Sequence, residues 1–404
     1  MRTFRLVVSL VVVCLITSMV QQLPFSKAGN SKGTLRQISN MESGWVEEYR
    51  ANNTIYSSNL FVEGKGSLQL TTGYDTGFSG AHLDIDPTNF GMCGFRMFVR
   101  CADWYKAEYF TLNLSPYKDW HDFFWVELKS LLNTPPNGEW IELVLSQSNF
   151  YTVGNPSWSS ITRIQVIAGS NQYRPLTFGV DDFSYFQNNR KASVSITFDD
   201  GQESVFTKAK LLMDAYGYKG TLFSIPSFID QPGFLNQYQM EELNIGGWDI
   251  GGHSNLYLTG VPDEMIEADL LATKNYLTSR NYRGADMFAL PYGQYNEKVL
   301  KKVREYFNWI RPDDSMFQPS GYVSNDRINS QIVVPNDVPV SVVMNWIDQA
   351  IKNRDSLVLV FHKIEDIPQY ESEYSTKDFK AILDYMQARN IDVIPLSQMV
   401  NGTD

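Results

Sequence analysis

The chain has 404 residues, a formal net charge of −11 and an aromatic content of 14%. This length predicts two domains, because a single hydrophobic core stops growing well below it. The acidic balance and the lack of any basic run leave no broad cationic face for a phosphate backbone, so we expect no nucleic-acid partner.

The first 28 residues have the pattern of a secretory signal. Arg2 and Arg5 precede an uncharged apolar run, residues 6–20, and a small-x-small site follows at 26–28. The run is shorter than the roughly 20 residues that span a bilayer, which favours cleavage over retention as an anchor. We therefore expect a secreted or cell-surface protein that touches a membrane only if residues 1–28 are not removed.

Residues 35–187 predict an all-β sandwich. Alternating runs such as 140–145 and 161–167 are separated by Gly, Pro, Asn and Asp, which is typical of antiparallel sheets. Cys93 and Cys101 lie in one predicted strand, where their separation of roughly 26 Å is too long for a disulfide. We expect two free thiols.

Two acidic residues mark the ends of this sandwich. Glu42 lies near its first predicted strand and Asp181 lies in its last. The arrangement resembles the jelly-roll carbohydrate-binding modules, in which such a pair often shares a structural calcium. Solvated turn carboxylates explain the pair equally well, so both interpretations stand. The sandwich also has aromatic side chains that could stack on sugars or, alternatively, fill its core. They are Trp104, Tyr105, Trp120, Trp125 and Trp158.

After a polar linker, the pattern changes to strands that alternate with helices over residues 191–404. Apolar positions at 205, 209, 212 and 213 and at 379, 382, 383 and 386 each share a helical face. The strand-helix alternation predicts a parallel α/β barrel or a doubly wound sheet. The predicted strands are 192–198, 220–225, 248–250, 287–290, 308–311, 356–361 and 392–395.

Polar residues follow several of these strands at their carboxyl ends. Asp199 and Asp200 follow the first, His253 the third, residues 291–293 the fourth, and His362 the strand at 356–361. In a parallel barrel those ends meet on one face, where active sites are built. Adjacent carboxylates repel unless a cation or proton offsets one of them, which points to a metal with a neighbouring base. The alternative is a solvated turn in which one Asp caps the next helix.

The segments 197–201, 252–254, 291–293 and 357–362 occur in this order. Together they resemble the motifs of the NodB-type polysaccharide deacetylases, carbohydrate esterase family 4, over about residues 190–400. The resemblance implies a distorted (β/α)7 barrel that removes N- or O-acetyl groups from sugars. It also implies one divalent metal, with Zn, Co and Ni as candidates.

Carried onto this chain, the resemblance assigns roles to five residues. Asp199 is the general base, while Asp200 and His253 bind the metal. The backbone N–H of Tyr292 helps to stabilise the oxyanion, and His362 is the general acid that protonates the leaving group.

Two positions depart from the family pattern. Tyr257 stands where the family has its third metal ligand, four residues after His253. We expect an oxygen donor from Tyr257, from Asn255 or from water to fill that place. Ala289 stands where many members have an arginine that orients the base, although the exported poly-N-acetylglucosamine deacetylases often share this alanine.

The sequence therefore predicts a hydrolase of carbon–nitrogen bonds other than peptide bonds. Its expected partner is an acetylated amino-sugar polysaccharide, with substrate contacts from Pro291, Tyr292 and Leu359. A glycan-binding protein on a degenerate barrel is the alternative, because one metal ligand is replaced. A hydrolase of a non-sugar amide also stays open, since a fold does not determine a substrate.

Overall fold

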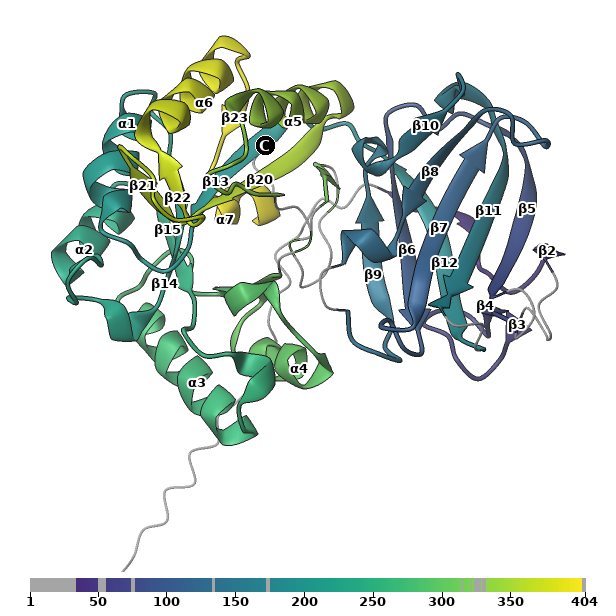
Figure 1. The fold of residues 1–404 in the computed structure, drawn as a ribbon, viewed down its shortest axis with the longest axis horizontal. Helices are drawn as coiled ribbons and strands as arrows, with labels where there is room; N and C mark the ends of the chain where they lie inside the picture. The colour runs from purple at the N-terminus through teal and green to yellow at the C-terminus, as the bar shows by residue number, and fades with distance from the viewer. Residues whose placement is uncertain are drawn as a thin grey trace, which may run out of the picture.

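The computed structural model describes residues 34–401 apart from 50–55, 74–76, 133–134, 172–174, 313, 315, 321, 323–327 and 329–331. An all-β part and an α/β part lie side by side (Figure 1). The expected signal segment, residues 1–28, lies outside the described residues. None of the helices that the structure describes is long and apolar enough to cross a membrane.

In the residues that the structure describes, the N-terminal part consists of two antiparallel sheets of six strands each. Sheet A has the order β3 (Tyr56–Ser57), β4 (Ser67–Thr71), β12 (Thr177–Gln187), β6 (Cys93–Cys101) and β9 (Ile141–Leu145), and β1 (Arg36–Ser39) also pairs with β12. Sheet B has the order β10 (Tyr151–Val153), β8 (Phe123–Glu127), β7 (Ala107–Ser115), β11 (Ile161–Ser170), β5 (Phe78–Thr88) and β2 (Val46–Tyr49).

One apolar core fills the space between the two sheets. It includes Phe95 and Phe178 from sheet A and Phe110 and Val166 from sheet B. The alternation read from the sequence thus predicted a sandwich correctly, because every second side chain of a strand enters the core. The two cysteines at the ends of β6 are buried and free, as expected from their spacing.

Among the described residues, the C-terminal part is built on a sheet of nine strands. Seven of them form one continuous parallel run in the order β17 (Trp309–Arg311), β16 (Met287–Ala289), β15 (Asp249–Gly252), β14 (Thr221–Ser224), β13 (Ser193–Phe198), β20 (Asp355–Phe361) and β19 (Ile332–Val333). β18 (Gln318–Pro319) pairs antiparallel with β20, and β23 (Asp392–Val393) pairs parallel with β13. The order from β17 to β13 follows the chain without the reversal of a doubly wound sheet, which favours the barrel.

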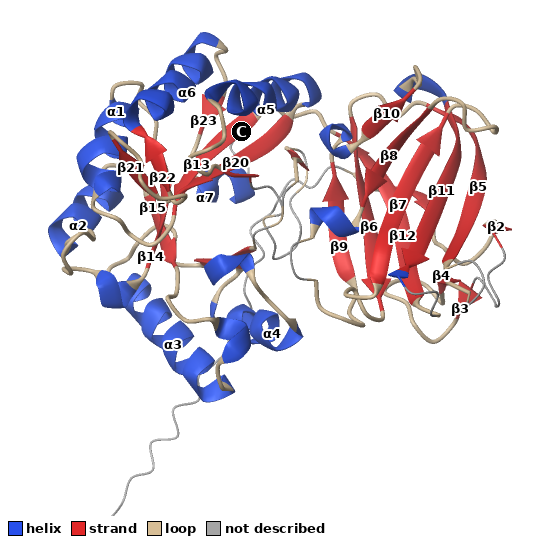
Figure 2. Cartoon of the chain, in the orientation of Figure 1, coloured by secondary structure: helices blue, strands red, loops and turns tan. Residues whose placement is uncertain are grey.

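Helices cover the outside of this barrel (Figure 2). The covering helices are α1 (Leu211–Asp214), α2 (Gln237–Ile245), α3 (Asp263–Ser279), α4 (Glu297–Tyr306), α5 (Val340–Asn353) and α6 (Thr376–Ala388). The last helix, α7 (Leu396–Asn401), packs instead against the side chains of the barrel interior. The helix expected to begin at residue 205 begins instead as a π-helix, Val205–Lys210, before α1. A short parallel pair, β21 (Lys363–Glu365) and β22 (Glu373–Ser375), follows β20 in the chain.

The central strands β13 and β20 are buried on both faces, which explains their continuous apolar sequence. Side chains of one parity, such as Phe198 and Leu359, enter the core between the sheet and the helices. Side chains of the other parity, such as Val358 and Val360, enter the barrel interior together with Phe223. Parity along a strand therefore decides which residues can reach the barrel mouth.

A buried carboxylate connects the two parts of the molecule. Asp355, the first residue of β20, accepts hydrogen bonds from the hydroxyls of Ser146 at 2.6 Å and Ser148 at 2.5 Å, both from the sandwich. Asn353 donates to the Ser148 hydroxyl at 2.7 Å. Burial raises the pKa of Asp355 to about 7, although the two serine hydrogen bonds oppose the shift.

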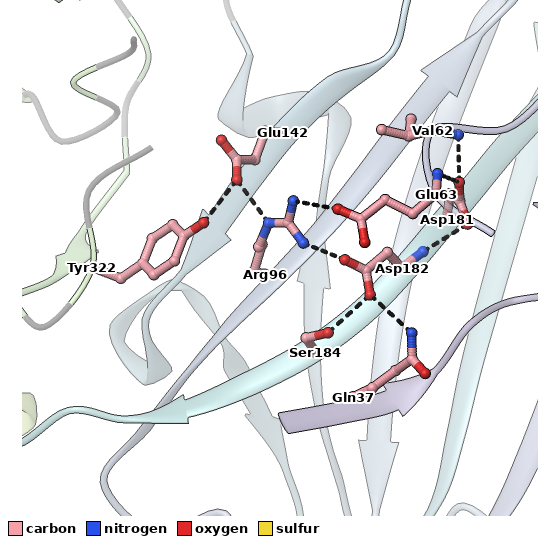
Figure 3. Close-up of polar contacts among 9 residues, drawn as sticks. All are labelled: Gln37, Val62, Glu63, Arg96, Glu142, Asp181, Asp182, Ser184 and Tyr322. Atoms are coloured by element: carbon pink, nitrogen blue, oxygen red, sulfur yellow. Dashed lines mark hydrogen bonds and ion pairs between the residues drawn. The ribbon is translucent and has the colours of Figure 1, made fainter. Parts of the chain in front are cut away.

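A second polar network centres on Arg96 of β6 (Figure 3). Its guanidinium pairs with Glu142 at 2.7 Å, with Glu63 at 3.2 Å and with Asp182. Tyr322, which follows β18, donates its hydroxyl to Glu142 at 3.1 Å. The buried guanidinium thus offsets several carboxylates and links the sandwich to the barrel through one tyrosine.

Candidate active site

A cleft of about 600 Å³ opens at the carboxyl ends of the barrel strands. Asp199, Asp200, His253 and His362 all line it. They follow β13, β15 and β20, so the barrel brings together the four titratable residues that sequence reasoning selected. Arg311 of β17 also lines the cleft, and the sequence pattern assigned no role to it.

Asp199 is held at the end of β13 by its backbone and by an ion pair. Its N–H donates to the carbonyl of Phe361 at 3.0 Å. Its Oδ2 lies 2.5 Å from Nη2 of Arg311, and both side chains are buried. Its Oδ1 is buried and has no hydrogen-bond partner among the residues that the structure describes. One oxygen is thus fixed, while the other stays available to accept a proton.

The charge of Asp199 is set by these neighbours. Burial alone would raise the pKa of Asp199, but the positive charge of Arg311, with smaller effects from His253 and His362, brings the pKa below its usual value. Asp199 is therefore an ionised carboxylate in a site almost closed to water. This is the state that a general base needs.

Arg311 lies beside position 289, where the family pattern has an arginine. Ala289 of β16 and Arg311 of β17 are direct register partners in neighbouring parallel strands. The guanidinium therefore comes from the strand next to the motif, and it also lies over the ring of Phe223 at 4.9 Å. The sequence signal that could have identified it is an arginine at the last position of a predicted strand, directly before Pro312. In the structure this arginine is buried.

Asp200 lies in a turn that only a special backbone permits. Its φ is 71° and that of Gly201 is 83°, so two consecutive residues adopt left-handed conformations. The N–H of Gly201 donates to the carbonyl of Asp199 at 2.9 Å and closes the turn. Such strain in a non-glycine residue is typical of functional sites. It turns the Asp200 carboxylate toward His253, with Oδ1 3.5 Å from Nε2.

His253 has one ring nitrogen assigned by its surroundings. Its Nδ1 lies 2.8 Å from the carbonyl oxygen of Ala289, which can only accept a hydrogen bond. In the neutral imidazole Nδ1 therefore carries the proton and Nε2 keeps its lone pair. That lone pair and the Asp200 carboxylate suit a divalent cation, and the carbonyl behind the ring is a usual partner of a metal-binding histidine.

The third ligand position is where the structure departs from expectation. Tyr257 does not line the cleft: its side chain is 49% exposed, and its hydroxyl donates to Gln294. Asn255, two residues earlier, does line the cleft. Within the described part of the chain no three His, Cys, Asp or Glu side chains form a group with metal-binding spacing. Of the expected donors, Asp200 and His253 lie together in the cleft, and Asn255 is better placed than Tyr257 to be a third.

The segment after β16 supplies the remaining wall. Pro291 and Tyr292 line the cleft, as the motif predicted. Tyr292 has φ 56° and ψ 15°, a left-handed conformation that a non-glycine residue adopts only under local constraint. The N–H of Gly293 donates to Leu290, which anchors the turn behind Tyr292. The Tyr292 side chain itself is largely exposed.

The last strand of the site places one expected residue in the cleft and another outside it. His362 lines the cleft, half-buried, directly after β20. Leu359, expected to contact substrate, is fully buried in the core beneath the helices and does not line the cleft. Val360 lines it instead, because its side chain has the opposite parity along the strand.

The expected calcium pair lies in the sandwich, far along the chain from this cleft. Asp181 is fully buried, and its Oδ2 accepts the backbone N–H groups of Val62 at 2.6 Å and Glu63 at 3.0 Å (Figure 3). Glu42 accepts the backbone N–H of Lys65. Amide donors of one loop thus hold both carboxylates, and the shared calcium stays a prediction.

Known proteins match the barrel part of the chain. Residues 186–306 match the family model described as polysaccharide deacetylase. No curated protein matches the sequence.

Several solved structures align with about half of the chain. The Xyl-CE4 domain of a multidomain xylanase from the hindgut metagenome of Trinervitermes trinervoides is 14% identical, over 52% of this chain and 90% of that chain, with a TM-score of 0.39. A family 4 carbohydrate esterase from Streptomyces lividans in complex with acetate is 13% identical, over 50% and 91%, with a TM-score of 0.37. A peptidoglycan deacetylase from Bacillus subtilis is 16% identical, over 53% and 91%, with a TM-score of 0.34.

The matched segment contains Asp199, Asp200, His253 and Tyr292, whereas Arg311 lies beyond it. The family assignment follows from this sequence match, which agrees with the ordered motifs. Residues 186–306 therefore belong to the polysaccharide deacetylase family.

Proposed function

We propose that the chain is an exported, metal-dependent hydrolase that removes N-acetyl groups, or O-acetyl groups, from an amino-sugar polysaccharide. The observation that carries the proposal is the meeting of Asp199, Asp200, His253 and His362 in one cleft. The buried ion pair between Asp199 and Arg311 strengthens it, because it keeps the buried carboxylate in the ionised state that a general base needs.

Asp200 and His253 would hold the cation, which supplies Lewis-acid polarisation of the acetyl carbonyl when it is bound. Asp199 accepts the proton of the attacking water, and Arg311 keeps this carboxylate ionised and oriented. The backbone N–H of Tyr292 lies in the cleft wall, where a donor lowers the energy of the oxyanion. His362, which lines the same cleft directly after β20, protonates the leaving amine or alkoxide.

The cleft walls suit a sugar that carries an acetyl group. Phe228 and Phe234 line one side, with their ring centroids 4.7 Å apart. Ile225 and Val360 add apolar surface next to the charged groups. A small apolar wall beside a few convergent polar groups is the usual composition of a ligand cleft.

The direct test is acetate release from N-acetylglucosamine oligomers by the purified chain, with Zn, Co or Ni supplied. We expect turnover that depends on the metal and disappears in the Asp200→Asn and His253→Ala variants. Asp384→Asn, which alters an exposed ion pair on α6, is the matched control and should retain full activity. Metal uptake without acetate release from any acetylated sugar would contradict the proposal.

A second candidate is a glycan-binding protein that retains the cleft without efficient hydrolysis. The position of Tyr257 favours this candidate, because its side chain lies outside the cleft. Among the expected ligands that the structure describes in the cleft, only Asp200 and His253 then offer strong metal donors. Oligomer binding together with no acetate release, even at millimolar metal, would support this candidate over the enzyme. Turnover at any metal concentration would exclude it.

A further inference from the structure

A groove with a volume of about 990 Å³ lies between the sandwich and the barrel. We call it the seam groove. Its sandwich wall comes from β8, β10 and two short 3-10 helices, Gln147–Asn149 and Trp158–Ser160. Its barrel wall is one face of α5, with Phe317 beside it. Figure 1 shows α5 on the side of the barrel next to the sandwich.

The seam groove is separate from the catalytic cleft. Ser148 and Asn353 line it and belong to the hydrogen-bond network of Asp355, at the amino end of β20. His362 follows the carboxyl end of the same strand. Seven steps of extended chain separate Asp355 from His362 by roughly 23 Å. The Asp355 network also joins both walls, so the groove is formed before any ligand arrives.

Aromatic rings from both parts face the seam groove. Tyr151 of β10 is 64% exposed and packs at 5.0 Å against Trp125. Trp158 stacks on Phe124, which also lines the groove, with ring centroids 3.8 Å apart and an interplanar angle of 9°. Trp346 on α5 stands on the opposite wall. Rings that are held rigidly and partly exposed provide contact area at a low cost in conformational entropy.

Side-chain carboxamides line the seam groove together with the rings. Gln349 lies one turn after Trp346 on α5, and its side chain has no hydrogen-bond partner among the described residues. Asn155 contributes a second carboxamide from the sandwich wall. Such groups donate and accept at once, as the hydroxyl and acetamido groups of a sugar require.

The seam groove is close to electrically neutral in a chain of net charge −11. Among the described residues, Glu127 and Lys352 are the only charged ones that line it. The Glu127 carboxylate already accepts backbone N–H groups from residues 110, 129 and 130. A neutral surface of rings and amides is complementary to an uncharged hydroxylated polymer and not to a charged one.

We propose that the seam groove is a second polysaccharide site that binds an uncharged, N-acetylated stretch of the polymer on which the cleft acts. The proposal rests on the proposed function for the identity of the polymer. It assigns to Tyr151, Trp158 and Trp346 the task of stacking on sugar rings, and to Gln349 that of hydrogen bonding. A long chain bound there stays attached to the protein while its other units enter the cleft.

The test measures binding of a soluble N-acetylglucosamine polymer to the full chain carrying Asp199→Asn, so that the polymer is not altered during the measurement. Adding Tyr151→Ala and Trp346→Ala together should weaken binding about tenfold or more. Tyr238→Ala, which removes an equally exposed ring on α2, is the matched control and should leave binding unchanged. With Trp346 intact, Tyr151→Trp keeps a ring on β10 and should recover the polymer binding that Tyr151→Ala loses.

The same substitutions with Asp199 intact are then assayed for acetate release from the N-acetylglucosamine trimer. Unchanged trimer turnover together with weaker polymer binding is the expected result. Unaltered polymer binding in the double variant overturns the proposal, as does a fall in trimer turnover or a change in oligomeric state, since these indicate packing or self-association. Because Trp346 is partly buried, Gln349→Ala and Tyr151→Ala are tested singly as well.

Failure of the proposed function gives a different result. If no variant releases acetate but the double variant still loses polymer binding, the enzyme proposal is wrong and the seam groove stands as a glycan site. If acetate is released but the unaltered seam groove binds no polymer, the groove proposal alone is wrong.

Discussion

Asp199 and Asp355 are both buried carboxylates on the central strands of the barrel, but their charges are set in opposite directions. Asp199 follows the carboxyl end of β13, where Arg311 overcomes the effect of burial and lowers its pKa. Asp355 begins β20 at the opposite end of the barrel, where serine hydroxyls are its partners and burial raises its pKa to about 7. A neighbouring cation, more than the depth of burial, decides whether a buried carboxylate is charged.

This comparison separates two kinds of site in one fold. The carboxyl ends of the strands carry charged groups that can move protons, and the amino ends carry groups that connect the barrel to the sandwich. Burial is similar at both ends, so substitutions that change only the charge or the cation should affect activity at one end and stability at the other.

The largest effect is expected for Asp199→Asn. The amide cannot accept the proton of the attacking water, so acetate release should fall about 10³-fold. The amide oxygen still accepts from Arg311, and Asp200 and His253 are unchanged, so metal uptake should persist. Acetate release and metal content of the same preparation provide the measurement. Parallel loss of metal would instead make Asp199 a ligand and assign the base to another residue.

Arg311→Ala should come next, because it leaves Asp199 buried without its cation. Removing one member of a buried ion pair typically destabilises a protein by about 3–5 kcal/mol. We expect a lower thermal midpoint and weaker activity, both partly retained in Arg311→Lys, which keeps the charge but not the planar fork. A double variant, Ala289→Arg with Arg311→Ala, places the guanidinium on the neighbouring strand and should recover part of the activity. Wild-type stability in Arg311→Ala would show that Asp199 needs no cation.

Much of the site was predictable because its residues follow strands. Asp199, His253 and His362 are each adjacent in sequence to an apolar run, so topology alone places them on one rim. Arg311 was missed because its partner is distant in sequence and comes from another strand. Leu359 was predicted wrongly because a motif specifies a segment, whereas strand parity determines which side chain faces the cleft. Tyr257 shows the same limit for a loop, because its spacing in sequence from His253 does not determine where its side chain points.

The sandwich teaches a similar lesson about rings. Period-two alternation predicted its two sheets, and the free cysteines followed from strand length. Composition could not separate Trp104, which is buried in the core, from Trp158, which lines the seam groove. The groove itself was not predictable, because its walls come from residues about 200 positions apart that only docking of the two parts brings together.

Asp355→Asn tests the other end of the barrel. The folded-state pKa of about 7 lies above the usual 3.8, so the folded protein holds the proton more tightly. The stabilising contribution is complete below about pH 4 and is lost as pH rises through about 7. The difference of about three units corresponds to at most about 4 kcal/mol. The asparagine is neutral throughout and can still bond to both serines.

We therefore expect Asp355→Asn to gain stability relative to the unaltered chain as the pH is raised from 4 to 8. Urea unfolding at several pH values gives the difference between the two proteins, which cancels the titration of shared groups. Asp384→Asn, an exposed carboxylate on α6, serves as the control and should show no such trend. A constant difference across this range would mean that Asp355 keeps its charge in the folded protein.

The smallest effect concerns the incomplete ligand set, and it is tested by placing the same imidazole at two positions of one loop. Asn255 lines the cleft, so Asn255→His adds a nitrogen donor beside Asp200 and His253 and should tighten Zn binding by about tenfold. Tyr257 lies outside the cleft lining with its hydroxyl on Gln294, so Tyr257→His should change the affinity little. Competition with a chelator measures both affinities, and each variant is the control for the other. Tighter binding in Tyr257→His alone would show that this loop turns toward the metal when the metal is present, and would return the third ligand to the position where the family has it.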